Sequence, residues 1–184
     1  MTSSSPSDEA LRLRAGGPER VFHVVLVEPE IPPNTGNIAR LCGATRSVLH
    51  LVGQLGFRID EHAVRRAGLD YWHLVDVRQH ATLEEATTAI AAESAGQHSA
   101  PRRWLLSGKS TRSVYTTPFT PGDILVFGKE SVGLPEELLR AHPDEVIGIP
   151  TIGAVRSLNL ANAVAITLYE ALRQVGALED SMLR

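Results

Sequence analysis

The sequence contains almost no cysteine: Cys42 is the only one among 184 residues. A lone cysteine cannot form an intrachain disulfide, and it cannot build a zinc site from several thiolates. Aromatic residues are also sparse at 5%, whereas 43% of the chain is apolar and 21% is charged. A chain of this length and composition is typical of one globular domain, which buries enough apolar surface to fold without a disulfide or a structural metal.

Long hydrophobic runs are missing as well. No segment approaches the ~20 apolar residues of a membrane span, and the first residues lack the apolar core of a signal peptide. We therefore expect a cytoplasmic protein without a membrane partner. Because residues 1–20 are rich in Ser, Gly and Pro and have no apolar periodicity, we expect a disordered tail there, followed by a single domain over residues 21–184.

The formal net charge of −3 argues against a protein that is basic overall. Two segments nevertheless contain no acidic residue. Residues 31–59 carry Arg40, Arg46 and Arg58, and residues 94–122 carry Arg102, Arg103, Lys109 and Arg112. If these segments meet in the fold, they form a basic face, and if they do not, the cations are scattered and solvated.

Short apolar segments alternate with segments of helical character. The expected strands cover residues 21–27, 48–52, 73–77, 103–107, 124–128 and 145–149. The expected helices cover residues 35–45, a short segment after Asp60, residues 83–93, a short segment after Pro135, and residues 158–175. Thr82 and Glu85 have the spacing of a capping box, and Gly176 is placed to end the last helix. This alternation predicts an α/β domain with a mostly parallel sheet and helices on both faces.

The common nucleotide-binding and hydrolytic motifs are absent. The first predicted strand is not followed by Gly-x-Gly-x-x-Gly, so the chain lacks the fingerprint of a nicotinamide-dependent Rossmann enzyme. Gly108-Lys109-Ser110 resembles the end of a P-loop, but Arg103 stands where that motif needs its first glycine. Zinc-hydrolase and α/β-hydrolase motifs are likewise missing.

The loop after the first predicted strand, EPEIPPNTGN (28–37), is rigid and polar. Its prolines restrict the backbone, and Asn34 or Thr35 can cap the following helix and leave free N–H groups at its positive end. Arg40 stands six positions after Asn34 and can project toward a bound group. A capped helix with a solvated arginine explains the same pattern.

Two further loops share this character. In FGKESVGLP (127–135), Gly128 allows a ligand or another backbone segment to approach closely, and Glu130 places a carboxylate after a buried strand. In IPTIGAVRSLNLANA (149–163), Arg156 is the only charge, and Ser157 or Asn159 can cap the last helix. Ala161 and Ala165 would let another backbone pack closely against that helix.

Residues 28–40, 127–135 and 149–163 together resemble the three motifs of the SPOUT-superfamily RNA 2′-O-methyltransferases. The segment RAGLDYWH (66–73) is similar to the TrmL-like branch, the tRNA (cytidine/uridine-2′-O-)-methyltransferases that act on the wobble nucleotide. The resemblance implies an α/β fold with a C-terminal deep trefoil knot, a homodimer, tRNA as substrate and S-adenosylmethionine as methyl donor, without a metal.

The resemblance also implies roles for individual residues. The expected catalytic residues are Asn34, Arg40, Glu130, Ser157 and Asn159. The expected cofactor-binding residues are Leu106, Gly128, Ile149, Ser157 and Leu158. The expected tRNA-binding residues are Arg40, Lys109, Arg112, Arg156 and Arg173. Three positions differ from common family usage: Arg46 and Gln54 replace Gly and Pro, and Ala161 replaces Ser.

Transfer of a methyl group from a sulfonium to a ribose oxygen requires alignment of the two atoms and removal of the hydroxyl proton. The family pattern makes Arg40 the base, yet a guanidinium is rarely deprotonated in a protein, so Arg40 can instead bind a phosphate and stabilise the developing alkoxide. The alternatives are a methyltransferase for another tRNA site or for ribosomal RNA, and a catalytically silent RNA-binding relative.

Overall fold

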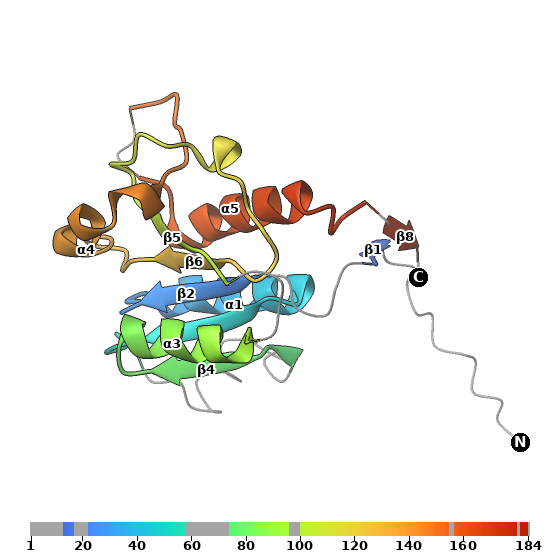
Figure 1. Cartoon of the computed structure of the whole chain (residues 1–184), viewed down its shortest axis with the longest axis horizontal. Helices are drawn as coiled ribbons and strands as arrows, with labels where there is room; N and C mark the ends of the chain where they lie inside the picture. Colours follow the sequence, from blue (N-terminus) through green and yellow to red (C-terminus); the bar gives the residue numbers. More distant parts are fainter. Residues whose placement is uncertain are drawn as a thin grey trace, which may run out of the picture.

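The computed structural model describes residues 13–16, 22–57, 74–95, 100–154, 157–179 and 181–183. In this part of the chain, a six-stranded sheet forms the centre of the fold, with strand order β4-β3-β2-β6-β5-β7 (Figure 1). The strands are β2 (His23–Val27), β3 (Val48–Val52), β4 (Val77–His80), β5 (Arg103–Leu106), β6 (Ile124–Phe127) and β7 (Val146–Ile147). Every pairing in this sheet is parallel, which confirms the predicted fold class.

Helices cover both faces of the sheet. Successive strand residues point to opposite faces, and here both sets are apolar, so each face packs against helices. Val24 and Leu26 belong to the apolar cluster under α1 (Pro32–Thr45) and α5 (Leu160–Gln174). Val25 belongs to the opposite cluster, with Ala86 and Ile90 of α3 (Leu83–Glu93). The short helix α4 (Glu136–Ala141) lies at the edge of this second cluster, and the 3₁₀ turns are η2 (Val114–Thr116) and η3 (Pro143–Glu145). The central strands are buried on both sides, as a parallel sheet requires.

The predicted capping box of α3 is confirmed, and of the two caps predicted for the last helix, Ser157 or Asn159, the structure has Asn159. Thr82 caps α3 by accepting the N–H of Glu85 at 3.1 Å, and the carboxylate of Glu85 accepts the N–H of Ala81 at 2.8 Å. Asn159 caps α5 by accepting the N–H of Ala161 at 2.9 Å. The predicted apolar stripe of α5 is buried at Leu160, Val164, Leu168 and Leu172. Gly176 follows with φ of 69°, a left-handed conformation that suits glycine after a helix end.

The predicted start of α1 is wrong. The helix begins at Pro32, and Ile31 occupies the N-cap position without a side-chain hydrogen bond. Proline at the first helical position has a backbone already suited to a helix, so no polar cap is needed. Asn34 and Thr35 consequently lie inside the first turn, and both are buried.

Some predicted segments differ from the structure or lie outside it. The strand predicted at 73–77 begins four residues later, as β4. Within the predicted disordered tail, β1 (Leu13–Ala15) pairs with β8 (Ser181–Leu183), so the expectation is wrong for these residues. Three residues are too few to give a periodic signal in sequence. The remainder of the tail, the helix expected after Asp60 and the segment 66–73 fall outside the described residues.

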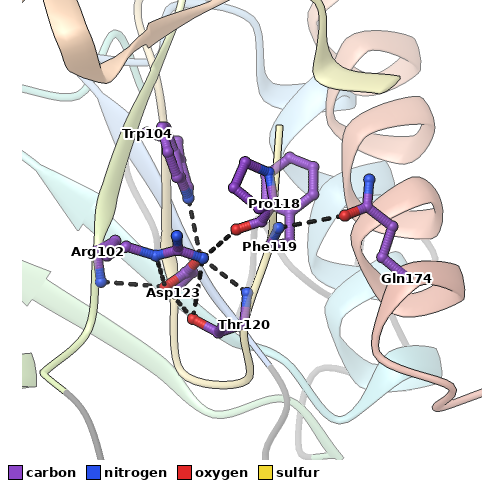
Figure 2. A network of polar contacts seen from close by, with 7 residues as sticks. All are labelled: Arg102, Trp104, Pro118, Phe119, Thr120, Asp123 and Gln174. Atoms are coloured by element: carbon purple, nitrogen blue, oxygen red, sulfur yellow. Dashed lines mark hydrogen bonds and ion pairs between the residues drawn. The ribbon is translucent and has the colours of Figure 1, made fainter. Parts of the chain in front are cut away.

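A buried carboxylate fixes the segment that precedes β6. Figure 2 shows Asp123 receiving hydrogen bonds from Trp104 Nε1 at 2.9 Å and Thr120 N at 3.0 Å, and pairing with Arg102 Nη2 at 3.1 Å. Asp123 is fully buried. Nearby, Gln174 of α5 accepts the N–H of Phe119 at 3.2 Å. These bonds attach the turn before β6 both to β5 and to the end of α5.

Candidate active site

Polar loops gather at the carboxyl edge of the sheet. Parallel strands end at the same edge, and ligands of open α/β sheets bind there. Leu106 ends β5, Gly128 directly follows β6, and Ile149 stands two residues after β7. Because β6, β5 and β7 are neighbours, these predicted cofactor-binding residues lie at one edge.

Glu130 connects the loop after β6 with the loop after β2. Its Oε2 accepts the N–H of Glu30 at 2.9 Å, and its Oε1 accepts the N–H of Ile31 at 3.3 Å and Asn34 Nδ2 at 2.9 Å. Partial burial by itself raises the pKa of Glu130, but the hydrogen bonds from Asn34 and the backbone outweigh it, so this pKa lies below its ordinary value. Glu130 is therefore an ionised hydrogen-bond acceptor at neutral pH.

A second hydrogen bond continues this connection to α5. Asn159 Nδ2 donates to Asn34 Oδ1 at 3.0 Å, and Asn159 Oδ1 caps the helix. The structure thus brings together Glu130, Asn34 and Asn159, one from each of the three predicted loops. We call this arrangement the amide chain.

Arg40 and Ser157 are not part of the amide chain. Arg40 lies exposed on α1, and six helical residues after Asn34 correspond to about 120° around the helix, so the two side chains leave it in different directions. Ser157 lies exposed two residues before Asn159. Both remain close in sequence to members of the amide chain.

Gly128 makes room for the backbone of its own loop and not for a ligand. A Cβ at this position would lie 2.1 Å from the carbonyl carbon of Gly133 and 2.2 Å from the nitrogen of Leu134. The backbone of the same loop therefore makes the close approach, which is one of the two alternatives that the sequence allowed. Gly133 has φ of 76° and donates its N–H to Lys129 O at 2.9 Å, which closes the turn.

Apolar surface lies beside this edge. Leu106 and Ile149 pack against the core cluster but stay half-buried, and Leu158 is half-buried before α5. The described loop residues 149–154 carry no charge and are mostly exposed. A cofactor with a flat purine ring requires apolar walls and nearby polar groups, and these residues fit that requirement. No group of three metal-binding side chains occurs among the residues that the structure describes.

The second acid-free segment is largely compensated in charge, because acids from elsewhere in the chain pair with three of its four cations. Arg102 pairs with Asp123, Arg103 with Glu145 at 2.6 Å, and Lys109 with Glu136 at 3.3 Å.

The other predicted tRNA-binding residues of the described regions are also engaged. Arg112 donates to Asp144 O at 2.6 Å, and Arg173 of α5 pairs with Glu170 at 2.9 Å. Arg156 lies outside the described residues.

The sequence interpretation missed Glu30 and Ser131, which are bonded to each other beside the amide chain. Glu30 accepts both the N–H and the hydroxyl of Ser131, each at 3.0 Å. It also missed an ion pair between Lys129 Nζ and Glu28 Oε2 at 2.8 Å. The partners are 101 residues apart, and the available signal was the presence of acidic residues in a loop predicted to face the site.

Solved structures show the same fold. One, described as "Structural insights into the 2-OH methylation of C/U34 on tRNA", has a TM-score of 0.75 and 44% identity, covering 86% of this chain and 97% of that chain. The SpoU methyltransferase AviRb from Streptomyces viridochromogenes, solved with AdoMet, has a TM-score of 0.71 and 26% identity, covering 87% of this chain and 62% of that chain. The fold is thus that of SpoU-type methyltransferases.

The model of the SpoU rRNA Methylase family matches residues 21–169, and the chain belongs to this family. A tRNA (cytidine(34)-2′-O)-methyltransferase of Acidovorax sp. (strain JS42) is 49% identical over 155 residues, which is 84% of this chain and 92% of that protein. The enzyme of the same name from Saccharophagus degradans is 45% identical over 157 residues, covering 85% of this chain and 97% of that protein.

Within the described residues, no helix is long and apolar enough to cross a membrane.

Proposed function

We propose that this chain is an S-adenosylmethionine-dependent tRNA 2′-O-methyltransferase that methylates the wobble pyrimidine, nucleotide 34. The observation that carries the proposal is the amide chain, which joins all three motif loops at the carboxyl edge of the sheet. The relatives with 41–49% identity over most of their length support the substrate, because their names specify nucleotide 34 of tRNA.

In this proposal, S-adenosylmethionine supplies the methyl group when bound, held by Leu106, Gly128, Ile149, Ser157 and Leu158. Gly128 acts through its backbone, since its own loop fills the space beside its Cα. Catalysis of an in-line displacement depends mainly on alignment of the ribose oxygen with the methyl group. Asn34 and Asn159 serve this alignment, and the exposed hydroxyl of Ser157 contacts the reacting groups.

Glu130 acts as an anchor, because three hydrogen bonds from the neighbouring loop occupy its oxygens. We assign Arg40 the role of a cation that binds the phosphate beside the target ribose and stabilises the alkoxide. Its exposure supports contact with a large substrate.

Lys109, Arg112, Arg156 and Arg173 are proposed to contact the tRNA backbone. Lys109 and Arg173 carry carboxylate partners that are replaceable by phosphate when RNA binds. Salt weakens both the exposed ion pairs and the RNA contacts, so binding should fall steeply with ionic strength.

We further propose a homodimer, and the trefoil knot expected for the family. The stripe of α5 that borders its buried face supports the dimer: Ala161 and Ala165 are half-buried, and Tyr169 is 47% exposed. Small side chains beside an exposed aromatic ring suit close packing of a second chain. Sedimentation of the 19.9 kDa chain should therefore give a dimer.

The experiment that tests the function is incubation of the protein with unmodified total tRNA and labelled S-adenosylmethionine, followed by nucleoside mass spectrometry and mapping. A 2′-O-methylated pyrimidine at position 34 supports the proposal. Methylation at another tRNA site or in ribosomal RNA would show that nucleotide 34 is not the substrate. Cofactor binding without transfer to any RNA would indicate a catalytically silent relative.

The variant Arg40→Ala tests the role proposed for Arg40. It should lose methylation while its affinity for S-adenosylmethionine stays unchanged. A parallel loss of both would mean that Arg40 acts in cofactor binding instead.

A further inference from the structure

The loops after β2 and β6 each provide a carboxylate to the other loop. Glu130 accepts the N–H of Glu30 at 2.9 Å, and Glu30 in turn accepts the N–H of Ser131 at 3.0 Å. The hydroxyl of Ser131 adds a third bond, to the other oxygen of Glu30, at 3.0 Å. Because residues 130 and 131 are consecutive, these bonds close a ring between the two loops. We call this ring of Glu30, Glu130 and Ser131 the carboxylate clasp.

The clasp is not needed to hold the loops near each other. The parallel pairing of β2 with β6 already brings the two strand ends together. Glu30 and Ser131 are both exposed, so their hydrogen bonds contribute little to the stability of the fold. The clasp instead fixes the orientation of one loop on the other.

The charges around the clasp support this interpretation. Glu28, Glu30 and Glu130 gather at the same loop pair, and carboxylates at short range repel each other. Lys129 pairs with Glu28 at 2.8 Å, and Glu28 raises the pKa of Lys129 with a smaller contribution from Glu30. Among the described residues, Lys129 is the cation whose ion pair with this group is seen, so the three carboxylates keep an excess of negative charge, and the hydrogen bonds of the clasp hold Glu30 and Glu130 in place against their repulsion.

That orientation determines where Glu130 points. With its backbone attached through Ser131 and its Oε2 on Glu30 N, the remaining oxygen of Glu130 lies 2.9 Å from Asn34 Nδ2. This bond turns the other end of the amide, Asn34 Oδ1, toward Asn159. A carboxylate free to rotate would let Asn34 turn as well.

We infer that Glu30 and Ser131 are positioning residues for methyl transfer: the carboxylate clasp holds Glu130 on Asn34 and thereby sets the orientation of the amide chain. The inference rests on the proposed methyltransferase function. Neither residue is assigned a contact with the cofactor or the substrate.

The kinetic test uses the full chain with its RNA substrate and S-adenosylmethionine. Glu30→Ala should lower kcat about tenfold or more, with KM for S-adenosylmethionine changed by less than about twofold, because misorientation affects the reacting geometry more than cofactor binding. Ser131→Ala should lower kcat less, and Ser131→Thr should restore it because threonine keeps the hydroxyl. Glu137→Ala is the matched control, since Glu137 is an exposed glutamate of α4 outside the clasp.

A second readout does not depend on activity. The side-chain amide of Asn34 gives a resolved pair of signals in a ¹⁵N–¹H spectrum, assigned by their loss in Asn34→Asp. Glu30→Ala should shift these signals and Glu137→Ala should not. If the Asn34 signals stay in place in Glu30→Ala, or if kcat stays within about twofold of the wild type, the positioning role is wrong.

The two readouts separate this inference from the proposed function. A wild-type protein that methylates no RNA would refute the function, while the Asn34 signals would still decide whether the clasp orients the amide. A fall in kcat accompanied by an equal loss of cofactor affinity and of thermal stability would show that Glu30 is merely structural.

Discussion

Asn159 Nδ2 donates a hydrogen bond to Asn34 Oδ1 over 3.0 Å, while Asn159 Oδ1 caps the first turn of α5. One side chain therefore fixes the start of α5 and also orients an amide at the beginning of α1. The two tasks use different atoms of Asn159, so they can be separated by substitution.

We expect Asn159→Asp to keep the cap of α5 and to lose most of its activity. Aspartate caps a helix as well as asparagine does, but it has no N–H to give to Asn34. Asn159→Ala should lose the cap too, at a cost of about 1 kcal/mol. The measurements are urea denaturation and initial rates of RNA methylation.

Thr82→Ala is the control, because it removes the cap of α3, a helix that contributes none of the predicted site residues. Thr82→Ala should lose about as much stability as the loss of a helix cap costs, about 1 kcal/mol, while its rate of methylation stays unchanged. Full activity of Asn159→Asp would mean that the bond to Asn34 has no part in the reaction.

Parts of the fold and of this site were accessible from the sequence because they depend on local chemistry. The cap at Thr82 is confirmed, and of the two cap candidates for α5, Ser157 and Asn159, the structure has Asn159. The same rule failed at Asn34, because Pro32 already begins the helix. The clasp partners Glu30 and Ser131 were missed, since their pairing depends on β2 and β6 being neighbours in the sheet.

The register of the sheet also creates a feature that no local pattern indicated. His23, His50 and His80 lie on the neighbouring strands β2, β3 and β4, and their rings are joined by two hydrogen bonds, each of 3.0 Å. In each pair, one ring nitrogen carries the proton and donates the hydrogen bond, and the nitrogen of the other ring accepts it. The three residues are 27 and 30 positions apart, so only knowledge of the strand pairing would have placed them together.

This row of histidines predicts acid sensitivity. Burial lowers the pKa of His50 to about 3; the neighbouring groups with the same effect are His23, His80 and Arg78, while Asp76 acts in the opposite direction. The unfolded chain binds a proton at His50 below pH ~6.5 and the folded chain does not, so stability falls as the pH drops from ~6.5 toward 3. One such group contributes at most about 1.4 kcal/mol per pH unit.

The measurement is the free energy of unfolding of the wild type and of His50→Asn at pH 7.5, 6 and 5. We expect the variant to be less stable at pH 7.5 and to lose less stability on acidification. Parallel curves for the two proteins would show that His50 is not the group responsible.

The buried carboxylate of Asp123 should be one of the most sensitive positions for stability. Asp123→Asn removes the charge that pairs with Arg102 and turns an N–H₂ group toward the donors of Trp104 and Thr120. Breaking a buried hydrogen-bonded charge costs about 3 kcal/mol. The exposed pair of Lys109 with Glu136 is the control, and Glu136→Gln should cost less than about 1 kcal/mol. Equal effects of the two substitutions on the urea midpoint would contradict this interpretation of Figure 2.

The end of α1 offers a test of backbone strain. Arg46 is the C-cap residue and has φ of 54°, a left-handed conformation that costs a residue with a side chain about 1 kcal/mol relative to glycine. Because Arg46 has an interaction of its own in the structure, the informative comparison is between Arg46→Gly and Arg46→Ala, which both lack the arginine side chain. Arg46→Gly should be more stable than Arg46→Ala by about 1 kcal/mol in urea denaturation. If Arg46→Ala proves equal or more stable, the left-handed backbone at residue 46 carries no strain, and the departure from glycine has no energetic cost.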